Sequence, residues 1–202
     1  MKTEVVEEPV PPLGEYADIP IAFEVRDVLD VIDDVNGHVS LTPRRLPVSY
    51  VKDYDASGNG PARWAERFDL SAWGFFSAFH GASRVGCATV ARKTPTLEML
   101  DGRGDVALLW DIRVAPTARR LGIGTALFDA AAAWASARNC AQLKVETQNI
   151  NVAACRFYAR CGCVLGGVTR GAYREFPDEI QLEWSKDLRG HRDDARSFSI
   201  IE

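Results

Sequence analysis

The stretch from residue 105 to residue 138 constrains the fold more than any other part of the chain. Residues 105–114 read DVALLWDIRV, a largely apolar run typical of a buried strand, and Pro116 ends it. After a short loop, residues 122–138 place apolar side chains at helical spacing among alanines, which have the highest helix propensity. The sequence therefore predicts a strand, a glycine-bearing loop and a long helix in direct succession.

Side chains along this strand are expected to alternate between two faces. Asp111 and Arg113 would then share one face, away from Trp110. The full sets are Leu108, Trp110, Ile112 and Val114 on one face, and Leu109, Asp111 and Arg113 on the other.

Shorter patterns predict the remaining elements. Apolar runs at 73–79 and 84–91 flank the turn His80–Ser83 and predict a hairpin. Further strands are expected at 19–26, 46–53, 142–147, 163–167 and 179–185, and helices at 61–68 and 152–160, the second ended by Gly162. Strands and helices in this order predict an α/β (α+β) fold, with a mixed central sheet of about six or seven strands flanked by helices and parallel neighbours at its centre.

Length and composition fit one domain with additional ends. At about 150 residues per domain, the 202 residues hold one domain, which we place at residues 17–188. Residues 1–16 are acidic and proline-bearing and predict a flexible arm. Residues 189–202 predict a charged tail.

The charge balance and the hydropathy pattern argue against several classes of protein. With 28 acidic and 24 basic side chains the net charge is −4, so no basic surface for nucleic acid is expected. No apolar stretch approaches the roughly 18 residues of a membrane span, and no signal peptide is evident. Five cysteines without a C-x-x-C pair, and three histidines outside ligand spacing, argue against disulfides and a metal site. We expect reduced thiols and a cytoplasmic protein.

The loop before the long helix has the composition of an anion site. Gly122 and Gly124 let a ligand approach the backbone, and the first amides of a helix carry partial positive charge. Arg119 and Arg120 can add ion pairs to phosphate oxygens. The spacing is neither that of a P-loop nor that of a Rossmann fingerprint. The alternative is a glycine-softened helix start with solvated arginines.

Two stretches resemble a known enzyme family. WDIRVAPTARRLGIGTALFDAA is similar to the acetyl-CoA signature of the GCN5-related N-acetyltransferases (GNAT), in which R/Q-x-x-G-x-G/A follows a strand ending in V-x-P. The matching residues are Val114, Pro116, Arg119, Gly122 and Gly124. VETQNINVAACRFYARCGCVLGG resembles the streptothricin acetyltransferase branch. The resemblance is specific from about residue 107 to residue 188, and it implies the GNAT fold.

The resemblance implies that acetyl-CoA lies where two parallel strands splay apart, those carrying residues 112–114 and 145–148. The backbone of Ile112, Arg113 and Val114 would pair with the pantetheine arm as an added strand does. Amides of the loop would hold the pyrophosphate, namely those of Arg119, Arg120, Leu121, Gly122, Ile123, Gly124 and Thr125. Asn149 and Asn151 would contact the cofactor. As the alternative, these two asparagines form only a turn and a helix N-cap.

The same resemblance assigns the chemistry. Tyr158 would act as general acid toward the leaving thiolate, with Phe157 facing the core. The attacking amine must lose a proton, so a carboxylate base is expected: Asp111 first, Glu146 second. Relatives often carry Glu-Asp where this chain has Trp110-Asp111, so one of the two acidic residues of that pattern is replaced by tryptophan here. The alternatives are a core tyrosine at 158, a solvated or hydrogen-bonded carboxylate at 111, and a core or pocket role for Trp110.

The implied reaction is direct transfer to a primary amine of a small molecule, streptothricin-like or polyamine-like, in a ternary complex. Acidic side chains that could attract such a cation are Glu98, Asp101, Asp105, Glu175, Asp178 and Glu179, with Tyr173 nearby, although acidic runs are usually solvated. A protein N-terminal or lysine acetyltransferase is one alternative, and a non-catalytic acyl-CoA-binding module another. Exposed strand edges in such folds also allow a homodimer.

Overall fold

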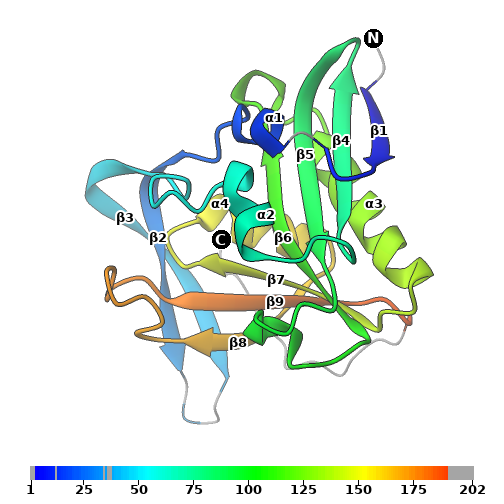
Figure 1. Cartoon of the computed structure of the whole chain (residues 1–202). Helices are drawn as coiled ribbons and strands as arrows, with labels where there is room; N and C mark the ends of the chain where they lie inside the picture. The colour runs from blue at the N-terminus through cyan, green and yellow to red at the C-terminus, as the bar shows by residue number, and fades with distance from the viewer. Residues whose placement is uncertain (1–2, 12, 34, 36–37, 191–202) are drawn as a thin grey trace. The chain divides into compact units, whose positions relative to one another are not determined.

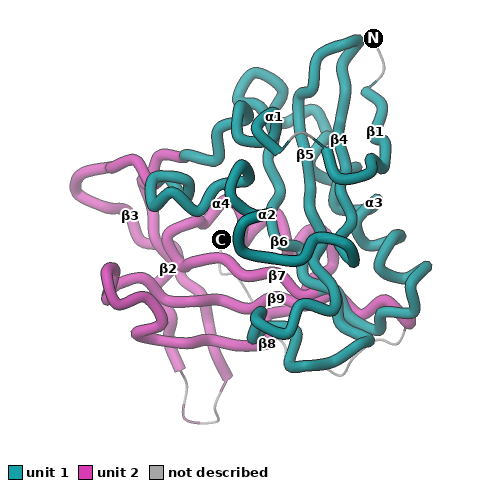
Figure 2. The backbone as a smooth tube through the Cα atoms, viewed as in Figure 1, with its two compact units in different colours: residues 1–22, 53–143 teal, residues 23–52, 144–202 magenta. Residues whose placement is uncertain are grey.

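The computed structural model describes residues 3–11, 13–33, 35 and 38–190 (Figure 1). It divides into two compact units, each built from two separate segments (Figure 2). Unit 1 comprises residues 1–22 and 53–143, and unit 2 comprises residues 23–52 and 144–202. The single-domain bounds 17–188 stay a prediction. The predicted tail lies outside the described residues from residue 191 onward.

Unit 1 contains a run of antiparallel strands. β1 (Thr3–Glu8) pairs with β4 (Gly74–His80), β4 with β5 (Ser83–Ala91), and β5 with β6 (Val106–Val114). The hairpin expected around residues 80–83 is confirmed, because His80 pairs with Ser83.

Helix α3 (Ile123–Ala137) of unit 1 confirms the long helix predicted over 122–138. It buries Ile123, Leu127, Ala131 and Trp134, which recur at helical spacing, and Figure 1 shows it alongside β4 and β5.

The N-terminal segment differs from the flexible arm that its composition predicts. Residues 3–8 form β1, and Tyr16 is fully buried, where its hydroxyl donates to the carbonyl oxygen of Phe76 at 2.9 Å. Arg84 pairs with Glu8 at 2.6 Å and with Glu15 at 2.8 Å. The acidic residues that suggested solvation are therefore ion-pair partners of a largely buried arginine.

Short helical turns connect the strands of unit 1. The helix expected at 61–68 is confirmed as a 3-10 turn followed by one turn of α-helix. Four side chains from these turns, Leu13, Tyr16, Trp64 and Leu100, join buried side chains of β4, β5 and β6 in one core cluster. The elements are α1 (Leu13–Ala17), η1 (Pro61–Arg63), α2 (Trp64–Arg67), η2 (Glu98–Leu100) and η3 (Pro116–Ala118).

Unit 2 contains a long hairpin that the sequence indicates only in part. β2 (Phe23–Asp33) and β3 (Val39–Lys52) pair over most of their length, beyond the strands expected at 19–26 and 46–53. Pro43 and Pro47 argue against a central strand, but a two-stranded sheet consists only of edge strands and tolerates them.

The remaining elements of unit 2 follow the predicted order. They are β7 (Gln142–Gln148), whose first two residues belong to unit 1, α4 (Val152–Arg160), β8 (Val164–Thr169) and β9 (Gln181–Asp187). Gly162 lies just past the end of α4, as expected. These strands belong to a seven-stranded sheet. Its strand order is β1-β4-β5-β6 in unit 1 and β7-β9-β8 in unit 2. The predicted α/β fold with a mixed sheet is confirmed; the splay of two parallel strands at the cofactor site stays a prediction.

Candidate functional site

Strand β6 has a bulge at the residue before Asp111. Thr89 of β5 pairs with Asp111, but the next residue, Val90, pairs with Leu109, so Trp110 is an extra residue on β6. Paired residues of neighbouring strands point to one face. The strict alternation predicted for this strand is therefore wrong. The register places Leu108 with Asp111 and Arg113 on one face, and Leu109 with Ile112 and Val114 on the other.

The loop between β6 and α3 turns sharply. Arg120 and Gly122 have φ angles of 68° and 80°, in the left-handed region. The Nε of Arg119 donates to the carbonyl oxygen of Val114 at 3.1 Å, which ties the loop to the end of β6. These contacts fix the direction in which α3 starts.

Within the described residues, no backbone or side-chain acceptor pairs with the amides of residues 120–125. The first amide bond into α3 is donated by Ala126 to the carbonyl of Gly122, at 3.0 Å. Arg119 and Arg120 are exposed beside them. Free amides at a helix start favour an anion, and the binding of a pyrophosphate here stays a prediction.

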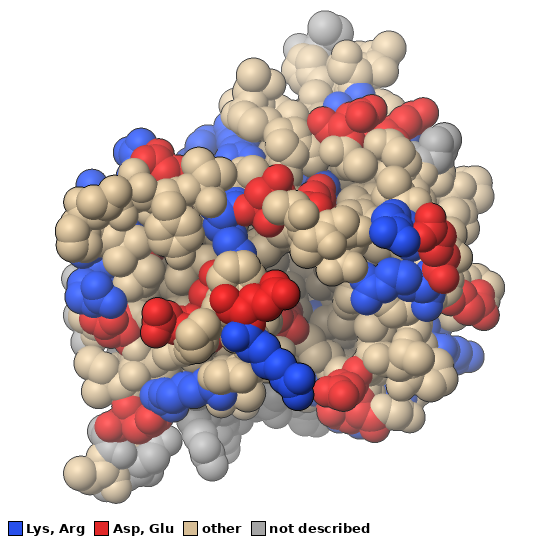
Figure 3. Space-filling view, turned by 60° about the vertical axis from the view of Figure 1, so that its left-hand side comes forward, with Lys and Arg blue, Asp and Glu red and all other residues tan. Residues whose placement is uncertain are grey.

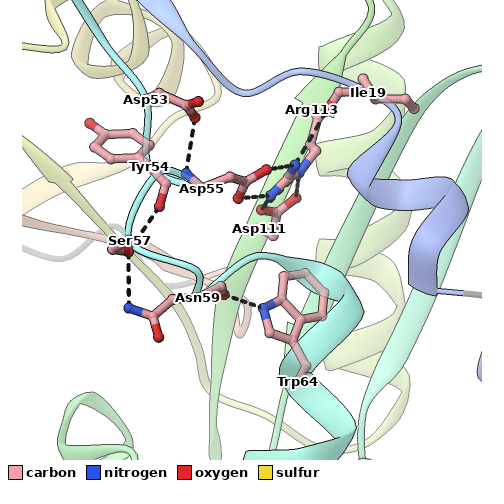
Figure 4. Close-up of polar contacts among 9 residues, drawn as sticks. All are labelled: Ile19, Asp53, Tyr54, Asp55, Ser57, Asn59, Trp64, Asp111 and Arg113. Carbon is pink, nitrogen blue, oxygen red and sulfur yellow. Dashed lines mark hydrogen bonds and ion pairs between the residues drawn. The ribbon is translucent and has the colours of Figure 1, made fainter.

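Arg113 lies at the centre of a buried charge cluster (Figure 4). Its guanidinium donates to Asp111 at 2.7 and 2.8 Å, and to Asp55 at 2.7 and 3.0 Å. A further bond of 3.2 Å reaches the carbonyl oxygen of Ile19. The side chains of Arg113 and Asp111 are 1% and 6% exposed, and that of Asp55 is 27% exposed. We call these three side chains the Arg113 cluster.

Burial and ion pairing oppose each other in the Arg113 cluster. Burial alone would lower the pKa of Arg113, but hydrogen bonds to Asp111 and Asp55 outweigh burial and raise it. Burial raises the pKa of Asp111, and the hydrogen bonds from Arg113 only partly oppose this effect. Both oxygens of Asp111 accept from Arg113. This favours the hydrogen-bonded strand carboxylate considered above for Asp111.

Trp110 packs in a group of aromatic rings from unit 1. Its ring centre lies 5.3 Å from that of Phe68, 5.8 Å from that of Trp73 and 6.4 Å from that of Trp64. The first and third pairs are edge-on, a favourable geometry. Of the two roles considered for Trp110, the structure favours packing at the edge of the core.

The two asparagines before α4 hold the local structure of unit 2. The Asn149 amide donates to the carbonyl oxygen of Leu29 at 3.1 Å and accepts from the amide of Ile180 at 2.8 Å. Asn151 caps α4 by accepting from the amide of Ala154 at 3.1 Å. Both therefore have a structural role, and their cofactor contacts stay predictions.

Tyr158 and Glu146, predicted for the chemistry, both lie in unit 2. Tyr158 is 5% exposed on α4, whereas Phe157 is only partly buried, so the expected core residue of the pair is reversed. Glu146 is half-buried on β7, and its Oε1 accepts from the hydroxyl of Tyr173 at 2.5 Å. This contact joins Glu146 to the loop between β8 and β9.

The other acidic candidates divide into exposed and paired groups. Glu175 and Asp178 are exposed, but Glu179 is buried and pairs with Lys52 at 2.7 Å. Asp105 pairs with Arg103 at 2.9 Å. Figure 3 shows acidic and basic side chains interspersed on the face in view. Among the described residues, no group of three or more His, Cys, Asp and Glu side chains could hold a metal ion.

Sequence reasoning missed the partners of the candidate residues. Asp55 and Arg113 are separated by 58 residues, and Tyr173 and Glu146 by 27. No local pattern in the sequence links residues so far apart. The one usable signal was the polar residue pair on an otherwise apolar strand, Asp111 and Arg113, because buried charges require partners.

Comparisons with known proteins agree with the predicted family. The family model described as Acetyltransferase (GNAT) family matches residues 44–163. A streptothricin acetyltransferase of Escherichia coli is 31% identical over 198 residues, covering 96% of this chain and all of that protein. Streptothricin acetyltransferase A of Bacillus subtilis is 42% identical over 80 residues, 39% of this chain and 46% of that protein.

Solved structures include a protein of similar architecture with its cofactor. An acetyl-coenzyme-A-bound protein of Bacillus anthracis, assigned to the streptothricin acetyltransferases, superposes with a TM-score of 0.74 at 26% identity. The match covers 92% of this chain and 99% of that protein. No helix in the described part of this chain has the length and apolarity that a membrane crossing requires.

Proposed function

Because the chain belongs to the GNAT acetyltransferase family and is an acetyl-CoA-dependent N-acetyltransferase, we propose that it acetylates a primary amine of a small cationic molecule of the streptothricin type. The observation that carries this proposal is the match with the streptothricin acetyltransferase of Escherichia coli along the whole of that protein. Such a match includes the N-terminal third of the chain, where we expect the acceptor to be selected.

The loop before α3 is the proposed pyrophosphate site. Its support is the run of amides from residue 120 to residue 125, for which the described residues provide no acceptor, with the arginines at 119 and 120 beside it. The backbone of residues 112–114 and the asparagines at 149 and 151 are the further proposed contacts. Bound acetyl-CoA supplies an activated thioester to this site.

Glu146 is the proposed general base. An alkyl ammonium with a reference pKa of about 10.4 must lose a proton near neutral pH, at a cost of about 4 kcal/mol. Within the described residues, the Oε2 atom of Glu146 has no hydrogen-bond partner, so it can accept this proton. Both oxygens of Asp111 already accept from Arg113. We therefore place Glu146 before Asp111 as the base.

Tyr158 is the proposed general acid. A phenol with a reference pKa near 10 can donate a hydrogen bond or a proton to the thiolate that leaves. Replacing it with phenylalanine should lower kcat and leave CoA affinity unchanged. Unchanged turnover of Tyr158→Phe would remove the residue from the mechanism.

Two amide variants separate the candidate bases. Glu146→Gln should lower kcat by about 100-fold or more with little change in thermal stability, because it removes the proton acceptor. Asp111→Asn should mainly lower thermal stability, because it weakens the Arg113 cluster. Steady-state thiol release and melting curves measure both effects. The opposite pattern, normal turnover in Glu146→Gln and a stable but inactive Asp111→Asn, contradicts the assignment.

An acceptor panel tests the proposed substrate. Thiol release from acetyl-CoA would be followed with streptothricin, a polyamine, an aminoglycoside and a peptide with free lysine and α-amine. We expect the highest kcat/KM with streptothricin. A preference for the peptide would favour the protein acetyltransferase alternative. If the protein binds acetyl-CoA but releases no thiol from it in the presence of any of these amines, the non-catalytic module would be favoured.

A further inference from the structure

The loop between β8 and β9, residues 170–180, has an ordered path without helix or strand. It is built from two successive turns. The amide of Phe176 donates to the carbonyl of Tyr173 at 3.1 Å, and the amide of Glu179 donates to the carbonyl of Phe176 at 3.0 Å. Two linked turns give the loop a defined shape although most of its side chains are exposed.

Both ends of this loop are fastened to other elements of unit 2. Arg170 donates to Asp33 at 2.8 Å and to the carbonyl of Val31 at 3.1 Å, both on β2. At the other end, Ile180 and Asn149 exchange two hydrogen bonds, of 2.8 and 3.0 Å. These contacts connect the two ends of the loop to β2 and to the residue that follows β7.

The second turn is held by a buried lysine of β3. The Nζ of Lys52 lies 2.7 Å from Glu179 and 3.3 Å from the ring centre of Phe176. The side chains of Lys52 and Glu179 are 11% and 8% exposed. An ion pair this buried, with an aromatic ring on the cation, strongly resists separation.

Tyr173 stands between these attachments and points its hydroxyl at Glu146. The phenol donates to Oε1 at 2.5 Å, a charge-assisted hydrogen bond that fixes the carboxylate in one orientation. We propose that Tyr173 is a positioning residue that orients Glu146 and leaves its Oε2 to receive the proton of the amine. This inference rests on the proposed function, in which Glu146 is the base.

The loop explains why Tyr173 can do this. In a freely moving loop, the hydrogen bond from Tyr173 would be broken for part of the time. Contacts at both ends of the loop and in its second turn keep the phenol of Tyr173 in one position. Preorganised supporting contacts of this kind hold a reacting group within a fraction of an ångström.

A double-mutant cycle tests the inference. Tyr173→Phe keeps the ring and removes only the hydroxyl. We expect kcat to fall about 10-fold with the KM for acetyl-CoA unchanged, and we expect no further fall when Tyr173→Phe is added to Glu146→Gln. Tyr50→Phe is the control: Tyr50 is a tyrosine of β3 that is 43% exposed, and the kinetics of this variant should equal those of the wild type. Melting curves of all variants establish that each is folded.

The outcomes separate this inference from the proposed function. Normal kcat in Tyr173→Phe, while Glu146→Gln is impaired, overturns the inference and leaves the base assignment standing. An equal fall in kcat on removing the hydroxyl in both backgrounds also overturns it, because Tyr173 would then act independently of Glu146. Normal turnover of Glu146→Gln overturns the base assignment and the inference together.

Discussion

Arg113 is the residue that balances the charge of the buried Asp111 and of its neighbour Asp55. Its guanidinium is the partner of Asp111 and Asp55, and it also bonds to the carbonyl oxygen of Ile19. These contacts fasten the loop that follows β3 and the segment that precedes β2 to strand β6. Arg113 is therefore a structural residue whose backbone alone is proposed to serve the cofactor.

Replacing Arg113 should destabilise the protein strongly. Arg113→Met leaves the buried Asp111 and the partly buried Asp55 without a cation, and breaking a buried pair in this way costs about 3–5 kcal/mol. Arg103→Met is the control, because Arg103 and Asp105 are 43% and 36% exposed and such surface pairs contribute about 0–1 kcal/mol. Urea unfolding measures both values. Equal, small losses in the two variants would show that the Arg113 cluster contributes little.

At the scale of elements, the backbone conformation at the start of α3 determines the direction of the amides that are proposed to bind the pyrophosphate. Gly122 has a φ of 80°, and a Cβ there would meet nothing within 4 Å. The obstacle to a side chain is therefore the backbone conformation itself, which costs an L-residue about 1–2 kcal/mol. Relief of this strain would rotate the neighbouring amides away from their common direction.

Gly122→Ala should weaken the binding of CoA as well as stability. Gly102 provides the matched control, since it has a φ of 65° and equally open space around its Cα. Both variants should lose about 1–2 kcal/mol of stability, but only Gly122→Ala should raise the Kd for CoA in calorimetric titration. A similar Kd for both variants would contradict the location of the pyrophosphate site.

Elements with strong periodicity could be predicted from the sequence, and features set by distant partners could not. α3 and α4 and the hairpin around residue 81 match their predicted ranges within one or two residues. The bulge at Trp110 was not predicted, because a register shift depends on the residues of the partner strand. The strand β1 was not predicted, because glutamates in a sequence are typical of a solvated segment and their ion pair with the distant Arg84 cannot be seen there. The candidate residues at 111, 146 and 158 were named, but their contacts were not.

At the scale of the whole molecule, the residues with proposed roles are spread along the chain. The proposed phosphate loop belongs to unit 1, and Glu146, Tyr158 and Tyr173 belong to unit 2. The chain has a net charge of −4, yet arginines flank the proposed anion site. The net charge of the chain therefore does not predict the sign of the charge beside the proposed anion site.

The ratio of acetylated streptothricin to released CoA is the measurement that tests the central claim most directly. Purified protein, acetyl-CoA and streptothricin would be incubated, and thiol release and acetylated acceptor would be measured together by colorimetry and mass spectrometry. The account predicts one amine-acetylated streptothricin for each CoA released, with the acetyl on nitrogen. CoA release without acetylated streptothricin, or no CoA release with streptothricin while a peptide in a parallel reaction is acetylated with release of CoA, would contradict it.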